Sequence, residues 1–181
     1  MAAASVWLPG FVRRKKIREL AALTADAFGA LPPAFAPGSA AAALEAYALL
    51  TRRLADAAQA GEDSPGRIGE VERALGRSAF AFGQSLRKKF RVRSHSDALR
   101  LVRLAYMAIG ICLEIDATGG IRVPRCFFSR HYSEGTCRVI AALDEGVMSG
   151  ILGRGTLAFS ERITAGQTCC LASFRPTGGE P

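Results

Sequence analysis

The chain has 181 residues, of which 49% are hydrophobic and 22% are charged. These proportions are typical of a globular protein and exclude wholesale disorder, and the length suits one domain with a sizeable core. The formal net charge is +8, and much of the excess lies in two basic runs at 13–18 and 87–93.

We interpret the basic runs as solvated helix faces, because no RNA-binding or zinc-finger motif accompanies them. Attraction to a small anionic substrate is one alternative, and association with nucleic acid or an anionic membrane surface is another. Of these, binding to nucleic acid is not expected.

Five cysteines, an odd number, suggest a reducing compartment. Residues 1–16 place their charges after a short apolar run, which is the wrong order for a secretory signal. No apolar stretch reaches the roughly 18 residues that a membrane span needs. We therefore expect a cytoplasmic protein without a membrane span, and the oligomeric state stays open.

Apolar residues at helical spacing predict four helices in the first part of the chain. The expected ranges are 11–28, 39–60, 64–90 and 97–107, with a proline-rich loop at 31–39. The third helix carries Gly69, Gly76 and Gly83 at intervals of seven residues. This spacing predicts a groove in which a neighbouring helix approaches closely.

The hydrophobic period changes after Met107. Two short runs around a turn at 117–119 predict a β-hairpin, and a helix is expected over 133–152. Two further strands, 156–164 and 168–174, are expected to form a second hairpin. The predicted fold is therefore α+β, with a helical N-terminal half packed on a small antiparallel sheet of two hairpins separated by a helix. Residues 1–107 and 108–175 are expected to form one compact domain, followed by a flexible tail at 176–181.

Four of the five cysteines lie within the last third of the chain. Cys126 ends a predicted strand and Cys137 lies early in the following helix. Side chains of a strand alternate between faces, so only one of Cys169 and Cys170 points inward. The sequence predicts that Cys126, Cys137 and one cysteine of that pair approach one another, whereas Cys112 is expected to be a small core residue.

Three interpretations of this cysteine cluster stay open. Arg125, Arg138 and the start of the 133–152 helix would lower the pKa of a nucleophilic Cys126 or Cys137. Alternatively, the thiols would bind iron or an iron–sulfur cluster, with His131 or an exogenous group as a further ligand. The third interpretation is structural burial of all five thiols. A closed zinc site is not expected, because the C-x2-C spacing is missing.

Asp144 lies two helical turns after Cys137, among apolar neighbours. A buried carboxylate needs a partner, and Arg162 on a predicted strand is the obvious candidate. Such a pair is either architectural or functional. In the functional case it orients a substrate carboxylate or provides an acid or base whose pKa is raised by burial.

Three segments carry a resemblance to a known family. R-C-F-F at 125–128, the Asp144 helix ending at Gly153, and L-A-F-S-E-R-I-T-A-G-Q-T-C-C-L-A-S-F at 157–174 resemble the L-2-amino-thiazoline-4-carboxylic acid hydrolase family. The resemblance covers about the last third of the chain. The matching positions are Arg125, Cys126, Asp144, Arg162, Thr164, Gly166 and Cys170. The helix and final hairpin are also similar to vinyl-reductase-like small-molecule-binding domains, and more distantly to the plastid carotenoid-isomerase family, which is associated with iron.

The resemblance implies a cysteine-dependent hydrolase that acts on a carbon–nitrogen bond of a small cyclic amidine, expected to be anionic. Cys126 or Cys137 would attack the amidine carbon, Asp144 would transfer protons and Arg162 would hold a carboxylate or an oxyanion. Arg125, His131 and Thr164 are the expected substrate-binding residues. The alternative function is an iron or iron–sulfur protein, a sensor or a metal-dependent enzyme, with ligands drawn from Cys126, Cys137, Cys169 and Cys170.

Overall fold

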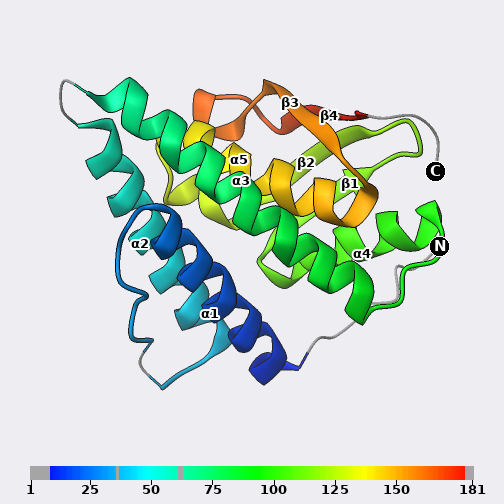
Figure 1. The fold of residues 1–181 in the computed structure, drawn as a ribbon, viewed down its shortest axis with the longest axis horizontal. Coiled ribbons are helices and arrows are strands. Elements are labelled where there is room, and N and C mark those ends of the chain that lie inside the picture. Colours follow the sequence, from blue (N-terminus) through cyan, green and yellow to red (C-terminus); the bar gives the residue numbers. More distant parts are fainter. Residues whose placement is uncertain (1–8, 36, 61–62, 178–181) are drawn as a thin grey trace.

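The computed structural model describes residues 9–35, 37–60 and 63–177 and has the predicted α+β fold, with the helical part N-terminal (Figure 1). The helices begin and end close to the predicted positions. Serine side chains cap three of them: Ser39, Ser94 and Ser133 each accept a hydrogen bond from a backbone N–H in the first turn. The helices are α1 (Gly10–Ala27), α2 (Ala40–Gln59), α3 (Ser64–Lys89), α4 (His95–Ala108) and α5 (Glu134–Leu152).

The strands form one antiparallel sheet in the order β1-β2-β4-β3. The two predicted hairpins are present, and β2 pairs with β4 to join them. The sheet consists of β1 (Ile111–Ile115), β2 (Gly120–Cys126), β3 (Gly155–Glu161) and β4 (Cys170–Pro176).

The second hairpin differs from the prediction at its turn. A short 3-10 helix, η2 (Ile163–Ala165), follows β3, so Arg162 lies just after the strand and not within it. At the other end β4 continues to Pro176, and the Thr177 N–H donates to the Arg154 carbonyl at 2.8 Å. The start of the predicted tail is therefore ordered by contacts, while its last residues, 178–181, lie outside the described part.

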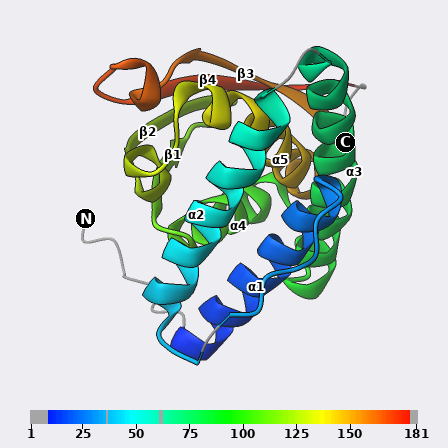
Figure 2. The same cartoon turned by 90° about the vertical axis from the view of Figure 1, so that its left-hand side faces the viewer.

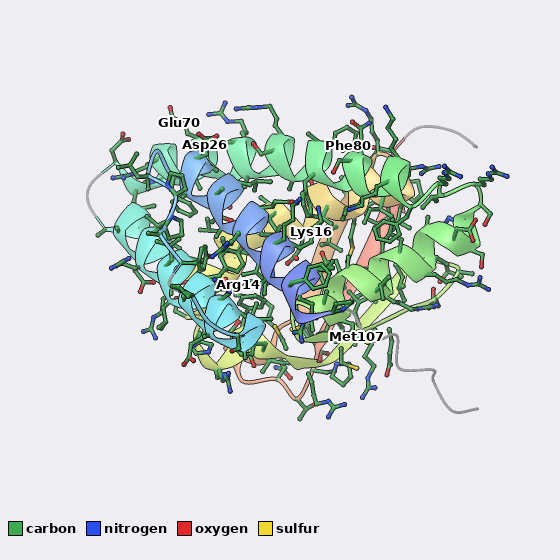
Figure 3. All side chains as sticks on the ribbon, turned by 90° about the horizontal axis from the view of Figure 1, so that it is seen from below. Arg14, Lys16, Asp26, Glu70, Phe80 and Met107 are labelled. Atoms are coloured by element: carbon green, nitrogen blue, oxygen red, sulfur yellow. The ribbon has the colours of Figure 1, made fainter. Side chains whose placement is uncertain are left out.

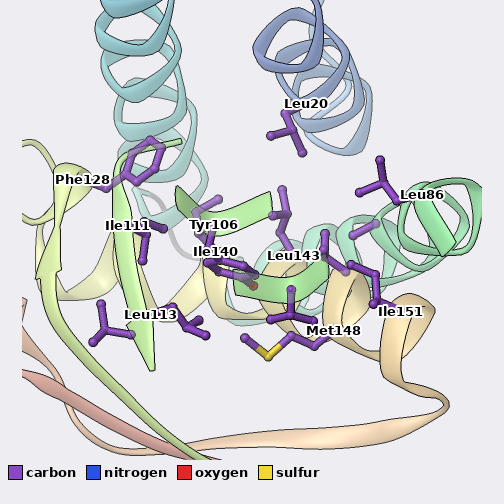
Figure 4. Packing of buried hydrophobic residues seen from close by; sticks show 14 of the residues in the cluster. Leu20, Leu86, Tyr106, Ile111, Leu113, Phe128, Ile140, Leu143, Met148 and Ile151 are labelled. Carbon is purple, nitrogen blue, oxygen red and sulfur yellow. The ribbon is translucent and has the colours of Figure 1, made fainter. Parts of the chain in front are cut away.

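All five helices lie on one face of the sheet, as Figure 2 shows. The inward side chains of β1, Ile111, Leu113 and Ile115, are buried against them, whereas Cys112 and Glu114 on the opposite face are exposed. Cys112 is thus a surface residue and not the core residue that its apolar character predicted. Figure 4 shows Tyr106 extending from α4 into the core beside Ile140 and Leu143 of α5.

Glycines set the distance between α3 and α5, which lie side by side in Figure 1. A Cβ atom on Gly83 would lie 2.5 Å from the Val147 carbonyl oxygen, and one on Gly150 would lie 2.4 Å from the Phe80 oxygen. The predicted close approach is therefore confirmed at Gly83. At Gly69, where a Cβ would meet nothing within 4 Å, it is wrong.

The basic runs contribute to the fold as well as to the surface. The Arg13 Nε donates to the Ala108 carbonyl at the end of α4 at 2.8 Å, and Arg87 Nη1 donates to the Ile151 carbonyl near the end of α5 at 2.7 Å. Both contacts place a cation at the carbonyl end of a helix, where the helix dipole favours it. The interpretation of these runs as wholly solvated faces is therefore wrong at these two positions. None of the helices in the described segments is long and apolar enough to cross a membrane.

Candidate functional site

A cavity of about 60 Å³ lies between the start of α5, the end of β2 and the η2 turn. Its walls combine apolar side chains with a few polar groups, as is typical of small-molecule sites. Asp144 of α5 forms part of the wall. The other polar or thiol groups around the cavity are Tyr47, Cys126, Ser129, Tyr132, Cys137, Thr164 and Cys170.

An irregularity in β2 directs Cys126 into this cavity. Ile121 and Val123 point inward, and strict alternation would then point Arg125 inward and Cys126 outward. Pairing with β1 shifts by one residue between these positions, because Glu114 pairs with Arg122 while Cys112 pairs with Arg125. The shift is a β-bulge at Pro124, which cannot donate to the ladder, and it reverses the two side chains.

The structure brings together three of the thiols, because Cys126, Cys137 and Cys170 line the same cavity. The Cys170 sulfur also accepts a hydrogen bond from the Ile163 N–H at 3.4 Å. Cys169 does not line the cavity and lies beside Arg122, whose side chain is exposed on the other face of the sheet. Alternation at the start of β4 thus selects Cys170.

The partner of Asp144 is a tyrosine. The Tyr106 hydroxyl of α4 donates to Asp144 Oδ1 at 2.9 Å. No ion pair within 4 Å joins Asp144 to Arg162, although both residues belong to the described part, so the predicted direct pair is wrong. The reason is that Arg162 lies beyond the end of β3, from where its charge acts on Asp144 only at longer range.

Burial determines the protonation of Asp144. Loss of hydration raises the pKa of its carboxyl from 3.8 to about 6, although the hydrogen bond from Tyr106 and the positive charge of Arg162 oppose this change. The pKa of Tyr106 is also raised well above its ordinary value, by burial and by the neighbouring carboxylate. Asp144 therefore changes charge close to neutral pH, where general acid–base catalysis is most effective.

The thiols are held in their neutral form. Burial raises the pKa of Cys126 to about 12, and burial also raises the pKa of Cys137 and of Cys170. The expectation that Arg125 and Arg138 lower these pKa values is wrong, because Arg125 is exposed and Arg138 pairs with Glu134 at the surface. Cys137 differs from Cys126 in that Thr164 and Arg162 both act to lower its pKa.

Arg162 is held by an unusual set of contacts. Its guanidinium lies over the ring of Phe159, 4.3 Å from the ring centre. Its Nε is buried and has no hydrogen-bond partner among the described residues. Arg162 is not part of the cavity wall, so it influences Asp144, Cys137 and Cys170 through its charge.

Of the three predicted substrate-binding residues, only Thr164 lines the cavity. Arg125 points to the exposed face because of the bulge at Pro124. His131 follows the 3-10 helix η1 (Phe127–Arg130), accepts a hydrogen bond from Arg130 at 3.0 Å and stacks on Phe127. His131 is not part of the cavity wall that the thiols line.

The thiols do not fit an iron or iron–sulfur centre. Among the described residues, no three side chains of His, Cys, Asp or Glu are arranged so that they could hold a metal ion. Cys169 lies outside the cavity that the other three thiols line. The predicted metal set of Cys126, Cys137, Cys169 and Cys170 is thus not assembled.

Sequence reasoning missed the tyrosines of the site. Tyr47, Tyr106 and Tyr132 all place hydroxyl groups in the core near Asp144, and burial raises the pKa of each. A tyrosine on the apolar face of a helix needs a hydrogen-bond partner once it is buried. Tyr106 lay on the apolar face of a predicted helix, and this requirement would have suggested it as a partner for Asp144.

Comparison of the chain with protein-family models, with curated proteins and with solved structures found no match. The structure by its own features defines an α+β protein with a buried carboxylate and three thiols around a small cavity.

Proposed function

We propose that the chain is a small-molecule hydrolase that opens a ring carbon–nitrogen bond of a cyclic amidine. The observation that carries the proposal is the position of Asp144, whose carboxyl group has a pKa of about 6 and shares a cavity wall with the Cys137 thiol. The family resemblance of the last third of the chain supports the same reaction class.

An amidine suits the charges of this cavity. Its protonated form would donate to the Asp144 carboxylate in a charge-assisted hydrogen bond, which is stronger than one between neutral groups. The positive charge of the bound amidinium would also stabilise a thiolate and so lower the pKa of Cys137. The amidinium thus supplies an activation that burial alone does not give the Cys137 thiol, with Arg162 and Thr164 acting in the same direction.

The proposed reaction proceeds in two stages. The Cys137 sulfur bonds to the amidine carbon while its proton passes to Asp144, which returns the proton to the ring nitrogen as the ring carbon–nitrogen bond breaks. Water then attacks the same carbon and gives its proton to Asp144, the carbon–sulfur bond breaks, and the sulfur regains the proton. Cys126, with its pKa of about 12, is assigned no chemical role.

Turnover of 2-amino-thiazoline-4-carboxylate tests the proposal, with ring opening followed by mass spectrometry. We expect Asp144→Asn and Cys137→Ser to abolish turnover, and the matched variant Cys126→Ser to retain it. In the wild type, kcat/KM should rise with pH through about 6, as Asp144 ionises.

Full activity of Cys137→Ser would refute the nucleophile, because a serine hydroxyl in the same place is far harder to ionise. Full activity of Asp144→Asn would refute the acid–base role. If the wild type, folded and with all thiols reduced, turns over neither this compound nor other cyclic amidines, the proposed function is wrong.

A further inference from the structure

A second cavity adjoins the first and plays no part in the proposed reaction. It has a volume of about 90 Å³ and lies between α1, α3, α4 and α5. The two cavities share Leu20, Ile109, Leu143 and Asp144 as walls. We call this second space, lined by these four residues and by apolar side chains of α3 and α4, the apolar chamber.

Positive charge surrounds the outer end of the apolar chamber. Arg13 and Lys16 come from α1 and Lys89 from the end of α3, so both basic runs of the sequence reach it. Figure 3 shows Lys16 on the side of α1 that faces α3, where its ammonium lies 5.4 Å from the centre of the Phe82 ring. Lys16 pairs with Glu19, whereas Lys89 is exposed at the end of its helix.

One exposed apolar side chain also lines the chamber. Phe90, at the end of α3, is part of the chamber wall and is 49% exposed. Phe11 and Met107 are also exposed, and they neighbour the chamber residues Val12 and Ala108 along α1 and α4. Arg13 donates to the Ala108 carbonyl, which holds the start of α1 against the end of α4. Phe90 and the three basic side chains therefore line the same chamber.

The inner end of the chamber carries the opposite charge. Asp144 and the Tyr106 hydroxyl close it, and a second anion there would be repelled by the Asp144 carboxylate. A ligand with one anionic end would therefore enter with its apolar end first. A cavity of about 150 Å³ accepts benzene, so the chamber, at about 90 Å³, suits the short and slender chain of a small amphipathic ligand.

We propose that the apolar chamber binds an amphipathic anion, with an unbranched apolar chain inside and the anionic group at the basic rim formed by Arg13, Lys16 and Lys89. The chain comes from a free carboxylate of short or medium length or from an anionic lipid. The site does not depend on the proposed hydrolase chemistry, because occupancy is measured without turnover.

Binding of hexanoate, measured by calorimetry and compared with hexan-1-ol, tests the site. We expect hexanoate to bind saturably and more tightly than the alcohol. Lys89→Gln should weaken hexanoate binding about fivefold, which corresponds to about 1 kcal/mol for one cation near an anionic group. The adjacent Lys88→Gln is the matched control, because Lys88 does not line the chamber, and binding should be unchanged.

A variant that fills the chamber provides a second test of the binding site. Ala105→Leu adds a larger side chain to the chamber wall and should abolish binding, with the fold checked by circular dichroism. Co-sedimentation with vesicles containing phosphatidylglycerol distinguishes the source of the chain. If hexanoate fails to bind, but the wild type sediments with vesicles and Ala105→Leu does not, the bound chain comes from a lipid. The proposal is overturned if neither probe binds, or if binding is insensitive to both Lys89→Gln and Ala105→Leu.

Discussion

At the scale of single residues, Asp144 shows how burial changes the chemistry of a common side chain. Its carboxyl has lost most of its hydration, and one hydrogen bond from Tyr106 only partly replaces it. The neutral form is therefore favoured over a wider pH range than in water. The same burial keeps the neighbouring thiols neutral, which is why Asp144 and not a cysteine changes charge near neutral pH.

This shift of the Asp144 pKa predicts a specific pH dependence of stability. Because the folded pKa of about 6 lies above the ordinary 3.8, the folded state binds the proton more tightly than the unfolded chain. The free energy of unfolding contributed by Asp144 is therefore highest below pH 3.8 and falls by about 3 kcal/mol as the pH rises from there to about 6. Asp144→Asn should remove this fall.

Urea unfolding of both proteins across this pH range checks the prediction. The stability of the variant relative to the wild type should increase as the pH rises. Asp26→Asn, which alters an exposed carboxylate of α1, is the control and should show no such trend. A constant difference between wild type and Asp144→Asn would contradict the raised pKa.

At the scale of elements, close backbone contacts set the distance between α3 and α5. Gly83 and Gly150 each lie against the backbone of the other helix, which a side chain would prevent. In the sheet, the bulge at Pro124 turns Cys126 toward the cavity. The glycines thus set the position of α5 against α3, and the bulge in β2 sets the direction of Cys126.

Substitution of these glycines should separate packing from helix propensity. Gly83→Ala and Gly150→Ala should each lower the free energy of unfolding by about 1–3 kcal/mol, because the added methyl overfills the α3–α5 contact. Gly69→Ala, in the same helix with open space around it, should raise it by about 0.5–1 kcal/mol. Thermal or urea unfolding measures all three. Equal effects at Gly83 and Gly69 would show that α5 does not approach α3 so closely.

At the scale of the whole molecule, one hydrophobic core joins the helical region to the sheet. Ile17 of α1, Leu75 of α3 and Val102 of α4 belong to the same buried cluster as Ile121 of β2 and Phe174 of β4. Within the described part of the chain, the helices cover the inner face of the sheet. The two regions, 1–107 and 108–175, are therefore expected to unfold together.

A fragment of residues 108–181 should consequently fail to fold alone. It retains α5 and the whole sheet but loses α3, which packs closely along α5, and α4, which contacts β1. We expect weak secondary structure by circular dichroism and strong binding of a hydrophobic dye. The full chain, by contrast, should unfold in one transition with coincident far- and near-ultraviolet signals. A fragment with a cooperative transition of its own would show two independent units.

The sequence by itself determined the element types and their order, because helical spacing, serine caps and the Thr118–Gly119 turn act within a few residues. It also predicted that one of Cys169 and Cys170 points inward, a consequence of strand alternation. Only the tertiary structure decided which of the two it is, that Tyr106 and not Arg162 contacts Asp144, and that Arg125 faces outward. These outcomes depend on a bulge and on contacts between elements far apart in the chain, and local periodicity carries no information about either.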